Sequence, residues 1–134
     1  MAGPIPFKPA PAGSKVAIVI DDDPTVRTLV ATTLSTIFAV YVADAAQRAM
    51  QLLLEIPTPH LIVCDVAMPG VDGIQFVRGL RAIPKLAATP VIFLTAKAMP
   101  MDVVAGINAG ARYYLTKPFN PTELIEKARK ATGR

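Results

Sequence analysis

The sequence predicts an α/β fold, a doubly wound five-stranded parallel sheet with five helices in (βα)5 order. Two observations support this prediction. Five short apolar runs alternate along the chain with segments whose apolar residues recur at helical spacing. The connections between them are short, and right-handed crossovers then place helices on both faces of one parallel sheet.

Each predicted strand is almost wholly apolar, as expected for strands that helices cover on both faces. The five runs are residues 16–20, 39–42, 61–64, 91–94 and 113–115. A chain of 134 residues with 52% hydrophobic content supplies enough apolar surface for one such domain.

The helices are predicted from capping residues and apolar spacing. Asp23 is predicted to be the N-cap of the first helix, which begins at Pro24, and Asp44 is predicted to cap the second helix. The third, fourth and fifth helices are predicted over about residues 73–82, 101–109 and 121–132.

The fourth helix is predicted to be the weakest element. Gly106 lies in its interior, where glycine costs about 1 kcal/mol relative to alanine. Its apolar stripe is thin, with Val103, Val104 and Ile107 as the expected anchors.

Residues 1–14 differ from the remainder of the chain. They contain Pro4, Pro6, Pro9 and Pro11, which disfavour helix and central strand. We therefore predict a flexible proline-rich N-terminal extension, followed by one folded domain over residues 15–132.

The charge pattern disfavours several classes of protein. The net charge is +4, but the basic residues are scattered, and the densest group lies in the last helix as Lys127, Arg129 and Lys130. A solvated helix face is the favoured interpretation, and no direct nucleic-acid binding is expected. No apolar run is long enough to span a membrane, and the N-terminus lacks a secretory signal. Because Cys64 is the only cysteine, no internal disulfide can form, and we expect a cytoplasmic protein.

Chemically useful side chains gather where the predicted strands end. Asp21, Asp22 and Asp23 follow the first strand, Asp65 the third, Thr95 the fourth and Lys117 the fifth. The carboxyl ends of parallel strands share one edge of the sheet, where ligands of such folds bind. We therefore expect these groups to line one crevice.

Crowded carboxylates repel one another unless a cation joins them, and hard oxygen ligands without a histidine or thiolate cluster favour Mg²⁺. A carboxylate can also act as a nucleophile and form an aspartyl-phosphate. The sequence thus predicts Mg²⁺ beside Asp65, with Lys117 and Thr95 stabilising a transferred phosphoryl group.

Four motifs occur in the order and spacing of a known family. The segments VIDDDPTVR, CDVAMPGVDG, FLTAKA and YLTKPF resemble those of the response-regulator receiver domain of bacterial two-component systems. The resemblance implies a flavodoxin-like, CheY-like (βα)5 fold. The resemblance covers about residues 15–132. It implies a signalling domain, not an enzyme, that promotes its own phosphorylation and dephosphorylation. The phosphodonor would be a sensor histidine kinase or a histidine phosphotransfer protein, and the motifs do not specify the downstream effector.

The resemblance also implies a role for each matching position. Asp21 and Asp22 resemble the acidic pair that binds Mg²⁺, together with Asp65 and the backbone carbonyl of Ala67. Asp65 is similar to the phosphorylated aspartate, Thr95 to the switch hydroxyl and Lys117 to the phosphate-pairing lysine. The supporting residues are Ala96, which leaves room for the phosphoryl group, Pro118, which forms a cis bond, and Tyr114, the switch aromatic that turns inward.

Two positions fall where, by the resemblance, side chains tune hydrolysis of the aspartyl-phosphate. Ala67 and Lys97 fall where the family varies, and neither offers a carboxylate or amide to orient an attacking water.

Three alternative functions remain open at this stage. The DDDPT segment also fits a haloacid-dehalogenase-like phosphatase with Asp21 as nucleophile and Asp23 as general acid, but no paired acidic motif follows later in the chain. A flavodoxin-like FMN carrier is disfavoured because three aspartates after the first strand would repel its phosphate. A scaffold that no longer accepts phosphate is disfavoured by the complete set of Asp65, Thr95 and Lys117.

Overall fold

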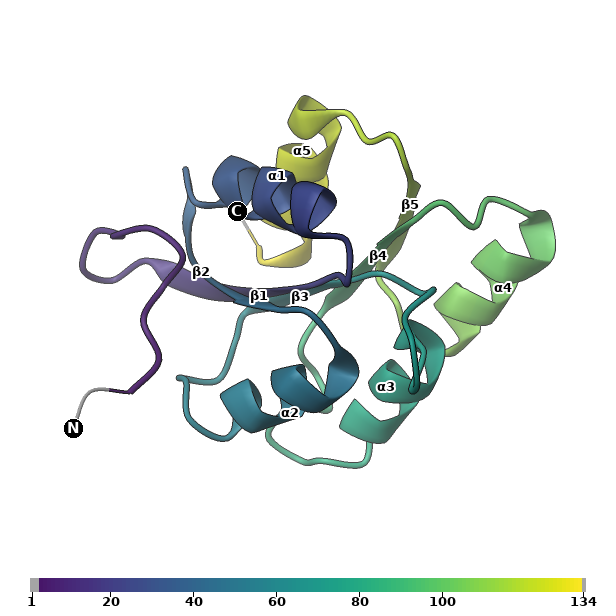
Figure 1. Ribbon diagram of the computed structural model, residues 1–134, viewed down its shortest axis with the longest axis horizontal. Coiled ribbons are helices and arrows are strands. Elements are labelled where there is room, and N and C mark those ends of the chain that lie inside the picture. The colour runs from purple at the N-terminus through teal and green to yellow at the C-terminus, as the bar shows by residue number, and fades with distance from the viewer. Residues whose placement is uncertain (1–2, 134) are drawn as a thin grey trace.

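The computed structural model describes residues 3–133 and confirms the predicted sheet. Five parallel strands pair in the order β2-β1-β3-β4-β5. Strands and helices alternate along the chain as β1 (Lys15–Ile20), α1 (Pro24–Leu34), β2 (Phe38–Ala43), α2 (Ala46–Leu53), β3 (Leu61–Cys64), α3 (Gly73–Leu80), β4 (Val91–Thr95), α4 (Pro100–Asn108), β5 (Tyr113–Thr116) and α5 (Pro121–Ala131). Figure 1 shows α1 and α5 over one face of the sheet, α2 and α3 over the other, and α4 beside β5.

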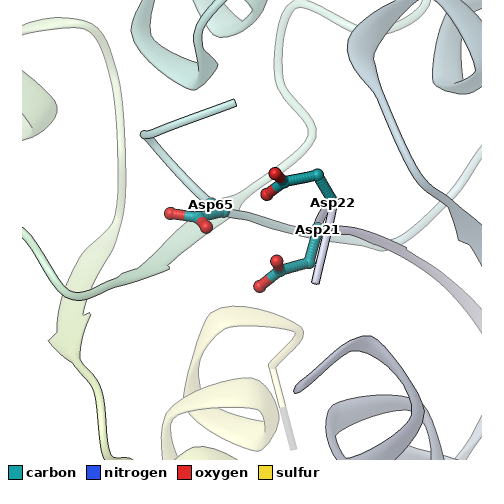
Figure 2. Close-up of side chains that lie close together, drawn as sticks. All are labelled: Asp21, Asp22 and Asp65. Atoms are coloured by element: carbon teal, nitrogen blue, oxygen red, sulfur yellow. The ribbon is translucent and has the colours of Figure 1, made fainter. Parts of the chain in front are cut away.

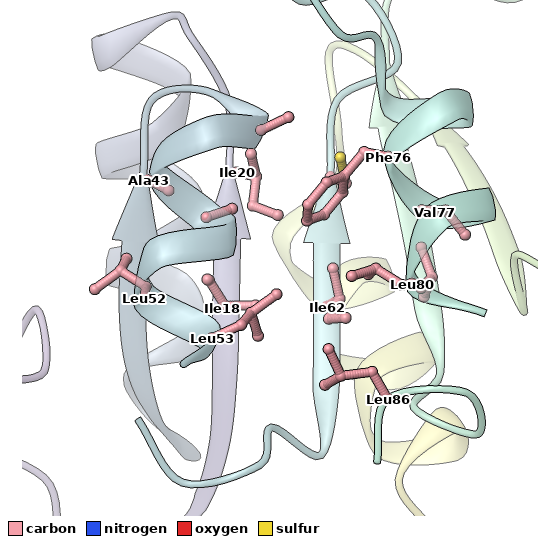
Figure 3. Packing of buried hydrophobic residues seen from close by; sticks show 14 of the residues in the cluster. Ile18, Ile20, Ala43, Leu52, Leu53, Ile62, Phe76, Val77, Leu80 and Leu86 are labelled. Carbon is pink, nitrogen blue, oxygen red and sulfur yellow. The ribbon is translucent and has the colours of Figure 1, made fainter. Parts of the chain in front are cut away.

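Alternate residues of each strand serve two separate cores. Ile18 and Ile62 face α2 and α3, where they pack with Phe76, Leu80 and other apolar side chains (Figure 3). The intervening strand residues face α1 and α5 on the other side of the sheet. Burial on both faces explains why the strands are near-continuous apolar runs.

The direction of winding changes between β1 and β3. From β1 the chain passes outward to β2, and after α2 it crosses back to β3 on the other side of β1. Such a switch point leaves a crevice at the carboxyl ends of the two central strands. The residues that follow β1 and β3 therefore lie in the position where this fold binds ligands.

The helix caps agree with prediction in one case and differ in another. Asp23 accepts hydrogen bonds from the backbone N–H groups of Thr25 and Val26, with Pro24 at the start of α1. The prediction that Asp44 caps α2 is wrong. The helix begins at Ala46 with Ala45 as N-cap, so Asp44 lies one residue too early for its carboxylate to reach the first turn.

The prediction for the anchors of α4 is wrong for Val104 and Ile107, whereas Val103 is half-buried. Val104 and Ile107 are 58% and 45% exposed, and the only buried residue between Pro100 and Asn108 is Gly106. The helix is thus rotated so that its glycine faces the domain and its larger apolar residues face outward. Helical spacing identified the element but not which face it buries.

The N-terminal extension contacts the folded domain through Phe7. The backbone N–H of Phe7 donates a hydrogen bond to the carbonyl of Val40 on the edge strand β2, at 2.6 Å. The half-buried Phe7 side chain packs against the core beneath α1 and α5. The sequence did not predict this contact.

Within residues 3–133, every helix is too short or too polar to cross a bilayer.

Candidate functional site

Three carboxylates converge at the switch point. Asp21 and Asp22 follow β1, and Asp65 follows β3 on the adjacent strand, where its backbone N–H donates to the carbonyl of Ile20 at 2.9 Å. One carboxylate oxygen from each side chain lies within 4.8 Å of the others. Figure 2 shows the three side chains close together. Asp21 and Asp65 are buried, whereas Asp22 is exposed.

Lys117 reaches this cluster from the end of the edge strand β5. It follows β5, and its backbone N–H donates to the carbonyl of Thr95 at 2.8 Å. Its Nζ lies 2.8 Å from Oδ2 of Asp21 and 3.0 Å from Oδ2 of Asp65. A single ammonium therefore bridges the two buried carboxylates.

The second oxygen of each buried carboxylate is held by the backbone. The N–H of Asp23 donates to Oδ1 of Asp21 at 2.9 Å, and that of Ala67 donates to Oδ1 of Asp65 at 3.1 Å. Both carboxylates are thus fixed at two points, which defines their orientation before any ligand binds.

The electrostatics reflect a shared cation. Burial raises the pKa of Asp21, and the hydrogen bonds from Lys117 and the Asp23 backbone offset this only in part. Burial alone would lower the pKa of Lys117, but its hydrogen bonds to Asp21 and Asp65 raise that pKa above its ordinary value. Lys117 has two carboxylate partners, and together they outweigh the effect of burial on its pKa. Asp21 shares the single ammonium with Asp65, so its pairing does not outweigh burial. The site therefore carries excess negative charge.

This excess charge and the donor set fit a hard divalent cation. The cluster offers carboxylate oxygens only, and the one thiol nearby belongs to the buried Cys64, which donates toward the Asp65 carbonyl. Burial and the neighbouring Asp65 raise the pKa of Cys64 well above its ordinary value, so the sulfur stays protonated and is a poor metal ligand. Asp21, Asp22 and Asp65 are the residues that would hold Mg²⁺.

The remaining predicted site residues lie around the same end of the sheet. Thr95 is fully buried at the end of β4, and its hydroxyl accepts a hydrogen bond from the N–H of Lys97 at 3.3 Å. Ala96 is exposed directly after it. The Lys117–Pro118 peptide bond is cis, as the resemblance implies. The Tyr114 hydroxyl donates to the carbonyl of Lys97 at 2.7 Å.

Comparison with known proteins identifies the family. The sequence model of the response regulator receiver domain matches residues 17–129. The chain belongs to the response regulator receiver domain family. It is similar to an uncharacterized 14.6 kDa protein of Leptolyngbya boryana, with 43% identity over 81% of this chain and 82% of that protein. It is also similar to the response regulator Rre1 of Synechocystis, with 38% identity over 87% of this chain, which spans about half of Rre1 (51%).

The fold of the receiver domain is confirmed by solved structures. Chemotaxis protein CheY4 of Vibrio cholerae matches with a TM-score of 0.83 and 28% identity, covering 89% of this chain and 99% of that one. The family supports two-component signalling and does not support the phosphatase alternative. The structure adds a physical reason: the Asp23 carboxylate, the general acid of that alternative, already caps α1 through two backbone hydrogen bonds.

Sequence reasoning missed two residues that shape the receiver site. Arg27 on α1 donates to the backbone carbonyl of Asp21 at 2.9 Å and so orients the acidic loop. Gly73 begins α3, where an added Cβ would overlap the carbonyl oxygen of Asp65 and lie 2.9 Å from the Cα of Val66. The available signal for Gly73 was a glycine in the first turn of a predicted helix. Because glycine lowers helix stability, its presence there indicates another requirement, such as the close approach of another segment.

Gly73→Ala is expected to destabilise the receiver domain by about 1–3 kcal/mol, because the new methyl group displaces the backbone that carries Asp65. The matched control is Gly79→Ala in the same helix, where the added Cβ meets nothing within 4 Å. This control should stabilise the domain by about 0.5–1 kcal/mol through helix propensity alone. Urea denaturation measures both. Equal stabilisation by the two substitutions would show that the close approach at Gly73 has no energetic consequence.

Proposed function

We propose that this receiver domain accepts a phosphoryl group on Asp65 in the presence of Mg²⁺ and then presents an altered surface to an effector protein. The donor would be a sensor histidine kinase or a histidine phosphotransfer protein. The observation that carries the proposal is the Lys117 ammonium, which bridges Asp21 and Asp65 inside a cluster of three carboxylates. We expect no direct contact of this domain with nucleic acid, because its basic residues form no continuous patch in the sequence.

In the proposed transfer, an Asp65 carboxylate oxygen attacks the phosphorus of the phosphodonor. The new bond is an aspartyl-phosphate, and the bond between phosphorus and the donor atom breaks. Lys117 lies 3.0 Å from Oδ2 of Asp65, so its ammonium is placed to pair with an oxygen of the incoming group. Stabilisation of charge on the phosphoryl oxygens is the main way in which proteins assist such a transfer.

The cation would supply further neutralisation of the phosphoryl oxygens when bound. Asp21 and Asp22 would hold it, together with Asp65 and the carbonyl of Ala67. The backbone N–H groups of Asp23 and Ala67 keep Asp21 and Asp65 in place for this role.

After transfer, the Thr95 hydroxyl is the switch group. Among residues 3–133 it accepts only the long 3.3 Å hydrogen bond from Lys97, so its own proton is free to be donated to a phosphoryl oxygen. The small Ala96 leaves space beside it. Movement of Thr95 would alter the environment of Tyr114, which contacts the carbonyl of Lys97 in the same loop. Since Ala67 and Lys97 provide no carboxylate or amide to orient water, this scheme predicts slow loss of the phosphoryl group.

Millimolar Mg²⁺ is expected to raise the melting temperature, because the cation binds the folded acidic cluster and not the unfolded chain. Saturation at 100 times the dissociation constant would stabilise the fold by about 2.7 kcal/mol. Labelling by acetyl phosphate should require the same cation and stop when a chelator removes it. A melting temperature that does not respond to Mg²⁺ would show that the proposed metal site is wrong.

Asp22→Asn distinguishes the repulsion among the three carboxylates from their binding of Mg²⁺. Asp22 is exposed and takes no part in the ion pairs with Lys117. Its neutralisation should therefore stabilise the metal-free domain slightly and should weaken the stabilisation by Mg²⁺. The exposed Asp44, outside the cluster, provides the matched substitution Asp44→Asn, which should leave the response to Mg²⁺ unchanged.

A further inference from the structure

Tyr114 connects α4 to the sheet. Its hydroxyl donates to the carbonyl of Lys97, which lies in the loop just before α4. Its ring packs edge-on against Phe93 of the neighbouring strand β4, with the ring centroids 6.1 Å apart and an interplanar angle of 62°. One side chain therefore contacts both the strand that ends at Thr95 and the loop that leads into the helix.

The Tyr114 ring lies against Gly106 on the inner face of α4. A Cβ added at Gly106 would lie 2.6 and 2.7 Å from Cδ2 and Cε2 of Tyr114, and 3.2 Å from Cδ2 of Phe93. A Cβ essentially never lies within 3.0 Å of another heavy atom, so the Tyr114 ring could not keep its present position beside any larger residue. The outward residues of the helix cannot hold it instead, because Met101 is 76% exposed and Val104 58%.

The other end of α4 is held independently of Tyr114. The guanidinium of Arg81 donates to the carbonyl of Gly110 at 3.0 Å. The same group donates to three carbonyls of the connection between α3 and β4, those of Leu86, Ala87 and Thr89. The C-terminal end of the helix is thereby fixed to the domain. At its N-terminal end, the carbonyl of Lys97 accepts from Tyr114 and the N–H of Lys97 donates to the Thr95 hydroxyl.

We propose that Gly106 determines the position of Tyr114, and through Tyr114 how firmly the N-terminal end of α4 is held to the domain. The glycine is a positioning residue for the switch, because the absence of a side chain at residue 106 makes room for the ring that bridges β4 and the loop after it. This role rests on the proposed function, in which Thr95 and the Lys97 loop respond to phosphorylated Asp65. A larger residue at position 106 displaces the ring, releases the carbonyl of Lys97 and uncouples α4 from the site.

A purely local role for Gly106 predicts the opposite effect on stability. If Gly106 only weakens its helix, Gly106→Ala raises the melting temperature, as alanine normally does in a helix interior. If Gly106 makes room for Tyr114, Gly106→Ala lowers the melting temperature, because the contact with the ring is lost. The two roles are therefore distinguished by the sign of the change.

The test measures melting temperatures for Gly106→Ala in the wild-type and Tyr114→Ala backgrounds. We expect a decrease in the wild-type background and an increase in the Tyr114→Ala background, where the ring is absent and only helix propensity remains. Gly79→Ala, which has open space around its Cβ, should raise the melting temperature in both backgrounds. An increase for Gly106→Ala in the wild-type background, or a decrease of equal size in both backgrounds, would overturn the proposal.

Hydrogen exchange locates the effect and separates it from the proposed function. Gly106→Ala should increase exchange over residues 97–104 and leave residues 110–112, beside the Arg81 contact, protected as in the wild type. It should also reduce the additional change in residues 97–104 that beryllofluoride, a phosphate mimic, produces in the wild type. Increased exchange spread evenly over the whole of α4 would contradict the role of Tyr114. Absence of any beryllofluoride effect in the wild type would instead contradict the proposed function, while the melting temperatures would still test Gly106.

Discussion

Asp65→Asn is expected to reduce labelling by acetyl phosphate and Mg²⁺ to background. In the proposed function Asp65 is the nucleophile, and its buried carboxylate is oriented by the ammonium of Lys117 and the N–H of Ala67. An amide has nearly the same size but is a poor nucleophile, and the fold should persist. The measurement is the base-labile label retained on the intact protein, with circular dichroism to confirm folding.

The matched control is Asp23→Asn, in the acidic segment that follows β1. Its carboxylate caps α1 and accepts from the N–H groups of Thr25 and Val26, so it faces the helix and not the cluster. We expect most of the label to remain, because asparagine is as good an N-cap as aspartate. Label that survives in Asp65→Asn would refute the assignment of the nucleophile.

Lys117→Met is expected to destabilise the metal-free domain by about 3 kcal/mol at neutral pH, because it leaves two buried carboxylates without their cation. The size of the effect should depend on pH. Burial already raises the pKa of Asp21, and removal of Lys117 raises it further. The folded variant then binds protons more tightly than the unfolded chain, so its stability falls as the pH rises above the ordinary carboxyl range near 4.

The loss relative to wild type should therefore be small in acid and largest at neutral pH. Urea denaturation between about pH 4 and pH 8 measures this profile, and Mg²⁺ should restore part of the stability. The exposed Lys85, far from the cluster, supplies the control Lys85→Met, which should change stability by less than about 0.5 kcal/mol at every pH. A loss for Lys117→Met that is the same at every pH would show that the ion pairs do not determine it.

Most of the fold could be predicted from the sequence because its strands are buried on both faces. A short apolar run such as residues 61–64, between two amphipathic helical segments, predicts a buried strand. Parallel strands in turn bring their carboxyl ends together. The positions of Asp21, Asp65, Thr95 and Lys117 at strand ends then predicted a shared site. The convergence of the three carboxylates and the lysine confirms the geometric part of that prediction.

What could not be predicted depends on contacts between elements far apart in the sequence. The contact face of α4 places Gly106 against the Tyr114 ring, a contact that no helical period encodes, so Val104 and Ile107 were wrongly expected to be buried. Gly73 and Gly106 looked like local weaknesses in their helices, yet each is approached closely by another segment. The start of α2 differs from the prediction by one residue, since Ala45 and not Asp44 is the N-cap.

The most direct test of the central claim is to locate the label in the wild-type protein. After treatment with acetyl phosphate and Mg²⁺, trypsin should release residues 16–27, which contain Asp21, Asp22 and Asp23, separately from residues 49–78, which contain Asp65 and Asp72. Mass spectrometry with fragmentation of the labelled peptide distinguishes the individual aspartates. The proposed function predicts an added phosphoryl group on Asp65 alone, present with Mg²⁺ and absent when a chelator is added. A phosphoryl group on Asp21, or a label on Asp65 that forms equally well without a divalent cation, would contradict it.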